Sequence, residues 1–382
     1  MLNPNNVAID LSYTQNAPYA TGIVESGLAV FTLIHERFPQ IAAIVTDSHP
    51  IPNKIPSDAN LVTIHGEVGS KEYWASLDAL LETKEAVFFP YQVLDHKFPK
   101  TACYLFFTYH DITPLTEWRF CGLNHREIQY CATLKKKVFY FAKQLIRLFG
   151  HIYRKRKSVM KHNLEIADAI FAVSNSTRSD VIKAFKVKDE SKIITIYGPR
   201  KTRKKSTDKP TISYKDFFLL VSTNRYLKNS IPAIKALNIL WASGDKRKAL
   251  LTGNPSKKLL KNAKFPEMVV PMAYLSDTDL DYLYENASVF IFPSASEGLG
   301  MPPLEALAYG TKTVCSNAMS LGEIYGDLPT FDPYDVKQIV AAIKKADELP
   351  KSFFADAHEA IAKRTEYKLD LVIDTLLKTN EK

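Results

Sequence analysis

The feature of this sequence that most constrains its fold is an apolar run that ends in a turn rich in glycine and proline, late in the chain. The run Ala287–Pro293 is long enough for one buried strand. Gly298 and Gly300 follow in a turn, and Pro302 and Pro303 suit the first turn of a helix, because the missing proline N–H costs no hydrogen bond there. The sequence thus predicts a strand, a glycine loop and a helix start, which is how α/β proteins present backbone N–H groups to an anion.

Two glutamates flank this glycine loop, with Glu297 at its mouth and Glu305 about one turn into the predicted helix. Each carboxylate could accept hydrogen bonds from sugar hydroxyls, while the loop amides between them face phosphate. A nucleotide sugar would suit that arrangement. The alternative is that Glu305 is only an acid favoured by the helix dipole and that the glycines only make a turn. The local sequence leaves both interpretations open.

The same pattern of strand, turn and helix recurs along the chain and predicts two α/β domains with parallel sheets. With 382 residues, the chain is too long for one compact core. We predict a first domain at 1–199, a polar linker at 200–210, a second domain at 211–357 and a C-terminal segment at 358–382. The predicted strands are Val7–Leu11, Ile41–Val45, Leu61–Ile64, Ala86–Phe89, Ala102–Thr108 and Ile166–Ser174, then Phe217–Ser222, Lys248–Thr252, Met268–Pro271 and Ala287–Pro293. The run Ile193–Pro199 closes the first domain.

His110 and Asp111 directly follow one of these predicted strands. They would therefore lie at the carboxyl end of a parallel strand, where open α/β sheets bind ligands. A histidine there can bond a sugar hydroxyl or carry a proton, and the neighbouring aspartate can fix its tautomer or bond hydroxyls itself. The alternative is a histidine that only satisfies loop carbonyls.

Arg225 and Lys228 follow the first predicted strand of the second domain, where cations would meet a diphosphate. Further along, the Asp-x-Asp spacing within Asp277–Asp281 suggests a metal site. Ser276 with Asp279 is, however, a capping box in front of a helix, and it explains these carboxylates without a metal. We therefore predict no metal site.

The basic character of the chain is concentrated in residues 135–162. This segment holds ten lysines and arginines and no acidic residue, in a chain whose formal net charge is +9. Lys136, Lys143, Arg147 and Arg154 share one helical face, opposite an apolar arc. Such a helix suits an anionic membrane surface, and an ordinary core-facing helix with a solvated cationic face is the alternative. We predict no nucleic-acid partner, because no binding motif accompanies the charges.

The remaining sequence features concern the compartment. The N-terminus carries no signal peptide pattern, and no apolar stretch reaches the roughly 20 residues of a membrane-spanning helix. The four cysteines form no CxxC pair, which favours a reducing compartment. We predict a cytoplasmic protein that lies peripherally on the inner face of the cytoplasmic membrane.

Taken together, these segments resemble the retaining glycosyltransferases of family 4. Glu297 and Glu305 match the Glu-x7-Glu motif of that family. The pieces that carry the resemblance are Thr108–Asp111, Ala167–Asp168, Val173–Ser174, Leu227–Asn229, Tyr274–Asp277, Leu280, Leu283–Tyr284, Ala287, Pro293–Ser294, Glu297–Ala306 and Gly310. They occur in the order that the family uses.

The resemblance implies a GT-B fold, an α/β architecture of two Rossmann-like domains facing a central cleft, with a C-terminal helix that crosses back to the first domain. It implies that the first domain binds the acceptor and the second binds the nucleotide-sugar donor. The implied catalytic residues are His110, Lys228 and Glu297, with Lys228 neutralising the diphosphate and Glu297 facing the transferred sugar. The implied donor-binding residues are Gly22, Asp111, Arg225, Lys228, Gly253, Tyr274, Leu275, Glu297, Gly298, Leu299, Gly300, Leu304 and Glu305. Two positions depart from the family, since Leu227 stands where arginine is common and Ala273 where glycine is usual.

The activity that the resemblance implies is retaining and metal-independent, with no cofactor. It would move a hexose, mannose favoured and GDP-mannose the favoured donor, from a nucleotide sugar to a glycan or lipid-linked acceptor in bacterial surface polysaccharide synthesis. The alternative is a non-catalytic GT-B homologue that binds glycans or membranes.

Overall fold

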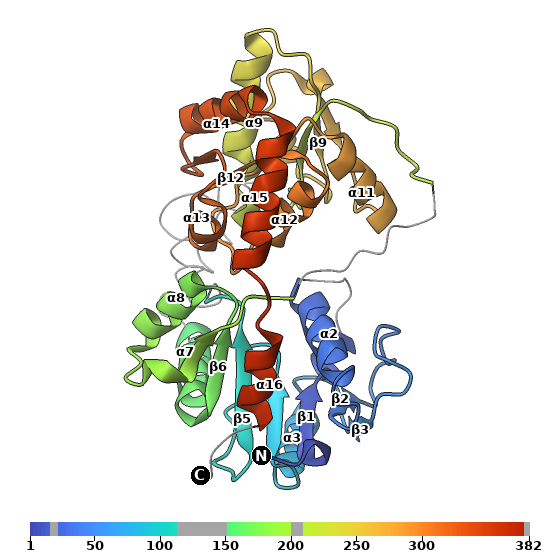
Figure 1. The fold of residues 1–382 in the computed structure, drawn as a ribbon, viewed down its shortest axis with the longest axis vertical. Helices are drawn as coiled ribbons and strands as arrows, with labels where there is room; N and C mark the ends of the chain where they lie inside the picture. Colours follow the sequence, from blue (N-terminus) through green and yellow to red (C-terminus); the bar gives the residue numbers. More distant parts are fainter. Residues whose placement is uncertain (16–21, 113–150, 200–208, 378–382) are drawn as a thin grey trace. The chain divides into compact units, whose positions relative to one another are not determined.

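The computed structural model describes residues 1–15, 22–112, 151–199 and 209–377, and these form two compact units (Figure 1). Within the described ranges, the first unit contains residues 1–112, 151–199 and 366–377, and the second contains residues 209–365. Each unit is built around one fully parallel sheet, as the sequence predicts.

The first unit has a seven-stranded sheet in the order β3-β2-β1-β4-β5-β6-β7. Its strands are β1 (Val7–Asp10), β2 (Ala42–Thr46), β3 (Leu61–Ile64), β4 (Ala86–Phe89), β5 (Tyr104–Tyr109), β6 (Ala169–Ala172) and β7 (Ile193–Thr195). Its helices are α1 (Ser12–Gln15), α2 (Gly22–His35), α3 (Lys71–Leu81), α7 (His151–Ile166), α8 (Asn175–Phe185) and α16 (Leu369–Leu377).

Alternate side chains of each strand serve the two faces of the first sheet. Ala8, Val87 and Phe107 point into a core that α3, α7 and α8 cover. Ile9 and Phe88, their neighbours in sequence, point into a separate core that α2 and α16 cover. The sheet is therefore buried on both faces, which explains why its strands are apolar throughout.

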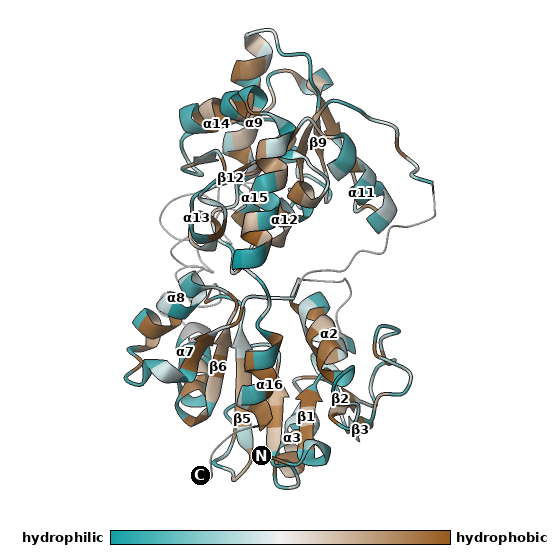
Figure 2. Cartoon of the chain, viewed as in Figure 1, coloured by the Kyte–Doolittle hydropathy of each residue, from teal (hydrophilic) through white to brown (hydrophobic). Residues whose placement is uncertain are grey.

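The second unit has a six-stranded sheet in the order β10-β9-β8-β11-β12-β13, with one continuous core. Its strands are β8 (Phe218–Leu220), β9 (Ala249–Leu251), β10 (Val269–Pro271), β11 (Val289–Phe292), β12 (Lys312–Ser316) and β13 (Thr330–Phe331). Its helices are α9 (Ser230–Ala242), α10 (Lys257–Leu260), α11 (Asp277–Asn286), α12 (Met301–Ala308), α13 (Ser320–Tyr325), α14 (Val336–Glu348) and α15 (Lys351–Arg364). In Figure 2, β9 is brown and much of α11 is teal, as expected for a buried strand and a solvated helix.

Both sheets reverse their winding direction once. In the first unit the chain moves outward from β1 to β3 and then returns to place β4 on the other side of β1. In the second unit the chain moves outward from β8 to β10 and then returns to place β11 on the other side of β8. The crevice at the carboxyl ends of such a strand pair is where doubly wound sheets bind ligands. This topology identifies the loops after β1, β4, β8 and β11 as the candidate binding elements.

The end of the chain divides between the two units. Helix α15 packs Phe354 and Ile361 into the core of the second unit. Helix α16 packs Val372 and Leu376 into the first unit, and the N–H of Leu2 donates to the carbonyl of Leu377 at 2.8 Å. The predicted boundary at residue 358 is therefore too early, because that position lies inside a helix whose apolar side chains belong to the second core.

Other predictions agree with the structure only in part, or fall on residues that it does not describe. The strand predicted from Ile166 is shorter, because Ile166 ends α7 and β6 begins at Ala169. Most of the cationic segment 135–162 and positions 200–208 of the predicted linker lie outside the described residues. The described end of the cationic segment, in α7, buries Val159 and Met160 and exposes Arg154. In the described part of the chain, no helix combines the length and apolar character needed to cross a membrane.

Candidate active site

Lys228 and Glu297 meet at the carboxyl ends of β8 and β11, the switch point of the second sheet. Lys228 ends the 3₁₀ turn Tyr226–Lys228, and Glu297 lies in the loop after β11. The Lys228 Nζ donates to Glu297 Oε1 at 2.6 Å, and the two side chains are only 11% and 15% exposed. The Nζ also lies 4.6 Å from the centroid of the Phe292 ring. Two residues predicted from separate motifs thus form one mostly buried ion pair.

Ser294 is a residue of this site to which the sequence analysis gave no role. Its buried Oγ donates to the same Glu297 Oε1 at 2.5 Å, while the Oγ of Ser320 donates to the Glu297 carbonyl at 2.8 Å. Lys228 and Ser294 both donate to Oε1 of Glu297. The other carboxylate oxygen, Oε2, accepts no hydrogen bond from the described residues. That oxygen is left for a ligand hydroxyl. A serine three positions before the motif glutamate was the available sequence signal.

The glycine loop after β11 has the conformation that the sequence predicts. Gly300 has a φ of 76°, and a Cβ built on it would lie 2.5 Å from the side chain of Leu321. Helix α12 then begins at Met301. Within the described residues, the amides of Leu299 and Gly300 donate no hydrogen bond. An anion could therefore accept from them.

Glu305 lies in α12, one turn after its start, next to the buried Leu304. The hydroxyl of Tyr284 in α11 donates to its Oε2 at 3.2 Å. Tyr284 itself is buried, so it holds one side of a carboxylate that is partly exposed. The sequence analysis placed Tyr284 in the family signature but gave it no contact with Glu305, because this contact joins two helices.

The loops after β8, β9 and β10 are tied together at the same edge. Gly253 has a φ of 87°, and its N–H donates to the Ala273 carbonyl at 3.3 Å. Tyr274 is 57% exposed, and its hydroxyl accepts a hydrogen bond from Asn224 Nδ2 at 2.8 Å. Leu275 packs against the core beneath it. The structure thus brings the predicted Gly253, Tyr274 and Leu275 together and adds Asn224, which holds an exposed aromatic ring.

Arg225 begins the 3₁₀ turn that carries Lys228, but its side chain is exposed and forms no ion pair within the described residues. Leu227 contributes its backbone, because its carbonyl accepts from the N–H of Ala295 at 2.8 Å. The loop after β8 is thus fastened to the loop after β11 at the position where the family commonly has an arginine side chain.

In the first unit, His110 directly follows β5. Its Nε2 bonds the Pro90 carbonyl at 3.0 Å, and its backbone N–H donates to Gln92 Oε1 at 2.9 Å. Burial lowers the pKa of His110 below its ordinary value of 6.5. At neutral pH the ring is therefore uncharged, with Nε2–H donating and Nδ1 able to accept a hydroxyl proton. The carbonyl of Pro90 fixes the tautomer, so the prediction that Asp111 does so is wrong.

Two other predicted residues, Asp111 and Gly22, belong to the first unit. Asp111 lies in the first unit, where its carbonyl accepts from Gln92 Nε2 at 2.9 Å. Gly22 is the exposed first residue of α2, and a Cβ built there would meet nothing within 4 Å. Packing within the described structure therefore does not require a glycine at this position.

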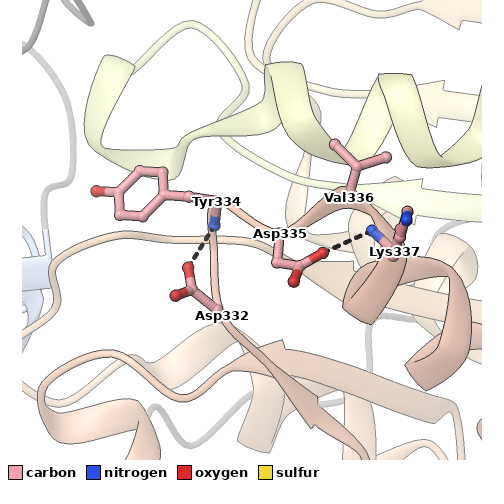
Figure 3. A pocket seen from close by; sticks show the side chains of 5 residues that line it. All are labelled: Asp332, Tyr334, Asp335, Val336 and Lys337. Carbon is pink, nitrogen blue, oxygen red and sulfur yellow. Dashed lines mark hydrogen bonds between the residues drawn. The ribbon is translucent and has the colours of Figure 1, made fainter.

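The second unit also has an open hollow of about 520 Å³ beside the start of α14 (Figure 3). Figure 3 shows the Asp332 carboxylate directed at the N–H of Tyr334 and the Asp335 carboxylate at the N–H of Lys337, each at 2.8 Å. Hydrogen bonds from the Gln338 and Lys337 backbone lower the pKa of Asp335. Carboxylates disfavour an anionic ligand, so this hollow does not suit a diphosphate.

Comparisons with known proteins bear on both units. The solved structure of WaaG, a glycosyltransferase involved in lipopolysaccharide biosynthesis, is similar over 98% of this chain and 100% of its own, with a TM-score of 0.63 and 14% identity. A glycosyltransferase from Rickettsia africae ESF-5 is similar over 98% and 99%, with a TM-score of 0.62 and 15% identity. The fold is therefore that of the GT-B glycosyltransferases, as the sequence resemblance implies.

Sequence comparisons relate the second unit to a known family. Residues 201–365 match the family described as "Glycosyl transferases group 1". The chain is 29% identical over 200 residues to the O-antigen chain mannosyltransferase B of Escherichia coli, an alignment that covers 48% of this chain and 52% of that protein. It is 30% identical over 204 residues to the serotype-specific mannosyltransferase WbdA of Escherichia coli, covering 48% and 25%. The chain spans about half the length, or less, of these curated relatives.

Proposed function

We propose that this chain is a glycosyltransferase that moves a hexose from a nucleotide sugar to a glycan or lipid-linked acceptor in bacterial surface polysaccharide synthesis. Mannose is the favoured sugar, which the names of the curated relatives support, and GDP-mannose is the donor that we propose for it. The observation that carries the proposal is the Lys228–Glu297 pair at the switch point of a group 1 glycosyltransferase region.

In the proposed donor complex, the diphosphate accepts from Lys228 and from the loop amides of Leu299 and Gly300. The free Oε2 of Glu297 accepts from a hydroxyl of the transferred hexose, and Glu305 accepts from the ribose hydroxyls. The exposed ring of Tyr274 offers a face for the base. These groups give each part of a nucleotide sugar a chemically matched partner on one sheet edge.

The proposed reaction exchanges two bonds at the anomeric carbon of the hexose. The bond from that carbon to the phosphate oxygen breaks, and its electron pair leaves with the nucleoside diphosphate. The acceptor oxygen bonds to the same face of the carbon, which retains the configuration, and the acceptor proton passes to the leaving phosphate oxygen. The neutral His110 accepts a hydrogen bond from the sugar near this carbon, through its free Nδ1.

We propose that no metal takes part in this transfer. Charge develops on the leaving diphosphate, and fixed donors at that point stabilise it more in the transition state than in the ground state. Lys228 supplies a full positive charge, and the amides of the glycine loop add oriented dipoles.

The test is a panel of nucleotide sugars, including GDP-mannose, screened by thermal shift and then for turnover with and without EDTA. A ligand that binds only the folded state must raise its stability. We expect one donor to raise the melting temperature, to be consumed with or without EDTA, and to give a product of unchanged anomeric configuration by NMR. Nucleotide binding without turnover would favour the non-catalytic homologue. Neither binding nor turnover with any donor would refute the proposal.

We further propose that the chain associates peripherally with an anionic inner-membrane surface through residues 135–162. The support is the charge of that segment, ten basic residues and no acidic one. Attraction to an anionic bilayer is screened by salt, so we expect binding to vesicles of phosphatidylglycerol that falls as salt rises. Vesicles of phosphatidylcholine are the matched control. Equal binding to both, or none to either, would contradict this association.

A further inference from the structure

An aromatic pair lies at the carboxyl edge of the first sheet, apart from the residues assigned above. Tyr13 lies in α1, directly after β1, and Tyr91 follows β4. Their ring centroids are 4.0 Å apart with planes inclined at 41°, and both side chains are partly exposed. Because β1 and β4 flank the switch point of this sheet, the pair lies where a doubly wound domain binds its ligand.

A buried carboxylate fixes one ring of the pair. Asp10, at the end of β1, is fully buried and accepts from the Tyr91 hydroxyl at 2.6 Å. It also accepts from the N–H and Oγ of Ser12 at 2.9 and 2.6 Å, and from the Tyr73 hydroxyl at 3.2 Å. With four donors already on it, Asp10 is a structural anchor for Tyr91 and not a ligand group itself.

The other ring is fixed by the helix that carries it. Gln15 clamps α1 to the end of β2, since Thr46 N–H donates to its Oε1 at 2.7 Å and its Nε2 donates to the His49 carbonyl at 2.8 Å. The Tyr13 hydroxyl donates to the Ile23 carbonyl at 3.3 Å. Both tyrosine hydroxyls are thus engaged inside the protein, and only ring surface is left for a ligand.

Gly27 in α2 makes room for this arrangement. A Cβ built on Gly27 would lie 1.8 Å from the Tyr13 hydroxyl oxygen and 3.5 Å from Pro90 Cγ. Alanine suits the interior of a helix better than glycine does, so the absence of a side chain here is a packing requirement of the Tyr13 ring. The substitution Gly27→Ala must displace that ring while favouring the helix.

The pair adjoins the histidine assigned to the reaction. Pro90, whose carbonyl bonds His110 Nε2, directly precedes Tyr91 in the loop after β4. Strands β4 and β5, which lead to Tyr91 and His110, are hydrogen-bonded neighbours, about 4.8 Å apart. A ligand resting on the tyrosines would therefore have its edge within reach of the imidazole.

We propose that Tyr13 and Tyr91 form an acceptor subsite that stacks on the C–H face of a pyranose ring and presents its hydroxyl toward His110. The face of an aromatic ring carries the negative part of its quadrupole, and it attracts the polarised C–H bonds of a sugar ring. The groups that hold the two tyrosines in place are a carboxylate, hydroxyls, amides and carbonyls. None of these groups is a cation that a charged ligand could bind. The pair suits a neutral sugar better than a diphosphate. This subsite rests on the proposed function, because it supplies the acceptor of that transfer.

The test compares Tyr13→Ala and Gly27→Ala with two controls, Tyr13→Phe, which keeps the ring, and Tyr214→Ala, which removes a 38% exposed tyrosine of the second unit. The probe is methyl α-mannopyranoside, with its dissociation constant measured by saturation-transfer NMR. GDP binding is measured by calorimetry on the same samples, and thermal melting verifies the fold. Loss of one stacking ring should weaken glycoside binding by about 2- to 10-fold.

We expect weaker glycoside binding in Tyr13→Ala and Gly27→Ala, with both controls and all GDP affinities unchanged. Unchanged glycoside affinity in folded Tyr13→Ala and Gly27→Ala overturns the subsite, as does a wild-type protein that does not bind the probe. A parallel loss of GDP affinity also overturns it, because the rings would then serve the nucleotide. Ring-dependent glycoside binding in a protein that turns over no nucleotide sugar would instead retain the subsite and reject the proposed function.

Discussion

In the second unit, the carboxyl edge of the sheet presents a lysine and a glutamate whose side chains are 11% and 15% exposed. In the first unit, the corresponding edge presents two tyrosine rings and a histidine whose pKa is lowered by burial, and its carboxylate Asp10 is fully buried. The two sheets share a topology, yet one edge offers charge and the other offers neutral and aromatic surface.

Under the proposed function, this difference divides two ligands between the two units. A nucleotide sugar carries a diphosphate, which needs a cation and oriented amides. A growing glycan is neutral at the reacting end, and it needs hydroxyl acceptors and an apolar face. The four predictions that follow test whether the charged edge and the neutral edge have these separate roles.

The largest effect is expected from Lys228→Met. Removing the cation should lower transfer by about 10²–10³-fold, because a fixed charge at the leaving group is lost. It should also cost stability, on the order of 3 kcal/mol, because Glu297 keeps a mostly buried charge without its partner. Steady-state kinetics and thermal melting measure the two effects, with the exposed Lys235→Met as the matched control.

The double variant Lys228→Met with Glu297→Gln separates stability from chemistry. Replacing the unpaired Glu297 carboxylate with a neutral amide should reverse most of the fall in melting temperature. It should not recover any of the transfer activity. Activity that recovers together with the melting temperature would show that Lys228 only holds the fold.

A smaller effect is expected from Ser294→Ala. The Ser294 hydroxyl bonds Glu297 Oε1 at 2.5 Å, and a hydrogen bond to a charged group contributes about 1.5–3 kcal/mol, so kcat should fall about tenfold or more. In a Glu297→Gln background the same change should have little further effect, since both act through one carboxylate. Ser320→Ala is the control, because it removes a hydroxyl that donates to the backbone carbonyl of Glu297 and not to its carboxylate. Equal losses from Ser294→Ala in both backgrounds would contradict a role in positioning Glu297.

Arg225→Ala should have a still smaller effect. An exposed charge contributes about 0.2–1 kcal/mol, so GDP affinity should fall by no more than about fivefold. That loss should shrink as salt rises, because exposed charges are screened. Calorimetry at two salt concentrations measures it. A loss as large as that of Lys228→Met would show that Arg225 replaces the arginine that is missing at Leu227.

The smallest effect is the pH dependence of stability in the first unit. Burial lowers the pKa of His110 below 6.5 in the folded state, so between these two pKa values only the unfolded chain is protonated. Stability should therefore fall as the pH drops from 6.5 toward the lowered pKa. His110→Gln should flatten that slope in denaturant titrations.

His65 is the matched control of opposite sign. Its hydrogen bond to Asp47 raises its pKa above 6.5, so its stabilising contribution is present below 6.5 and is lost as the pH rises through the raised pKa. His65→Gln should remove that opposite slope, weakly, because the histidine is exposed. The same sign of change in both variants would mean that burial does not determine the charge of His110.

The fold was largely predictable because its signals are local. Apolar runs such as Val289–Phe292 are strands whatever surrounds them, and Ser276 accepts from the Asp279 N–H at the start of α11, as the capping box predicts. The boundary predicted at residue 358 was wrong because helical periodicity does not distinguish a helix of one core from a helix of another. Only the packing of Phe354 and Val372 into different cores shows where the chain returns.

By itself, the sequence determined that this chain has two α/β units and which charged residues lie near the ends of their strands, including Lys228, Glu297 and Glu305. The tertiary structure decided what those residues touch. The hydrogen bond between Tyr91 and Asp10 joins residues 81 positions apart, and the ion pair of Lys228 joins residues 69 apart. Such pairings depend on the order in which parallel strands assemble, and no short segment encodes that order. The glycine loop was therefore visible in the sequence, but the free carboxylate oxygen beside it was not.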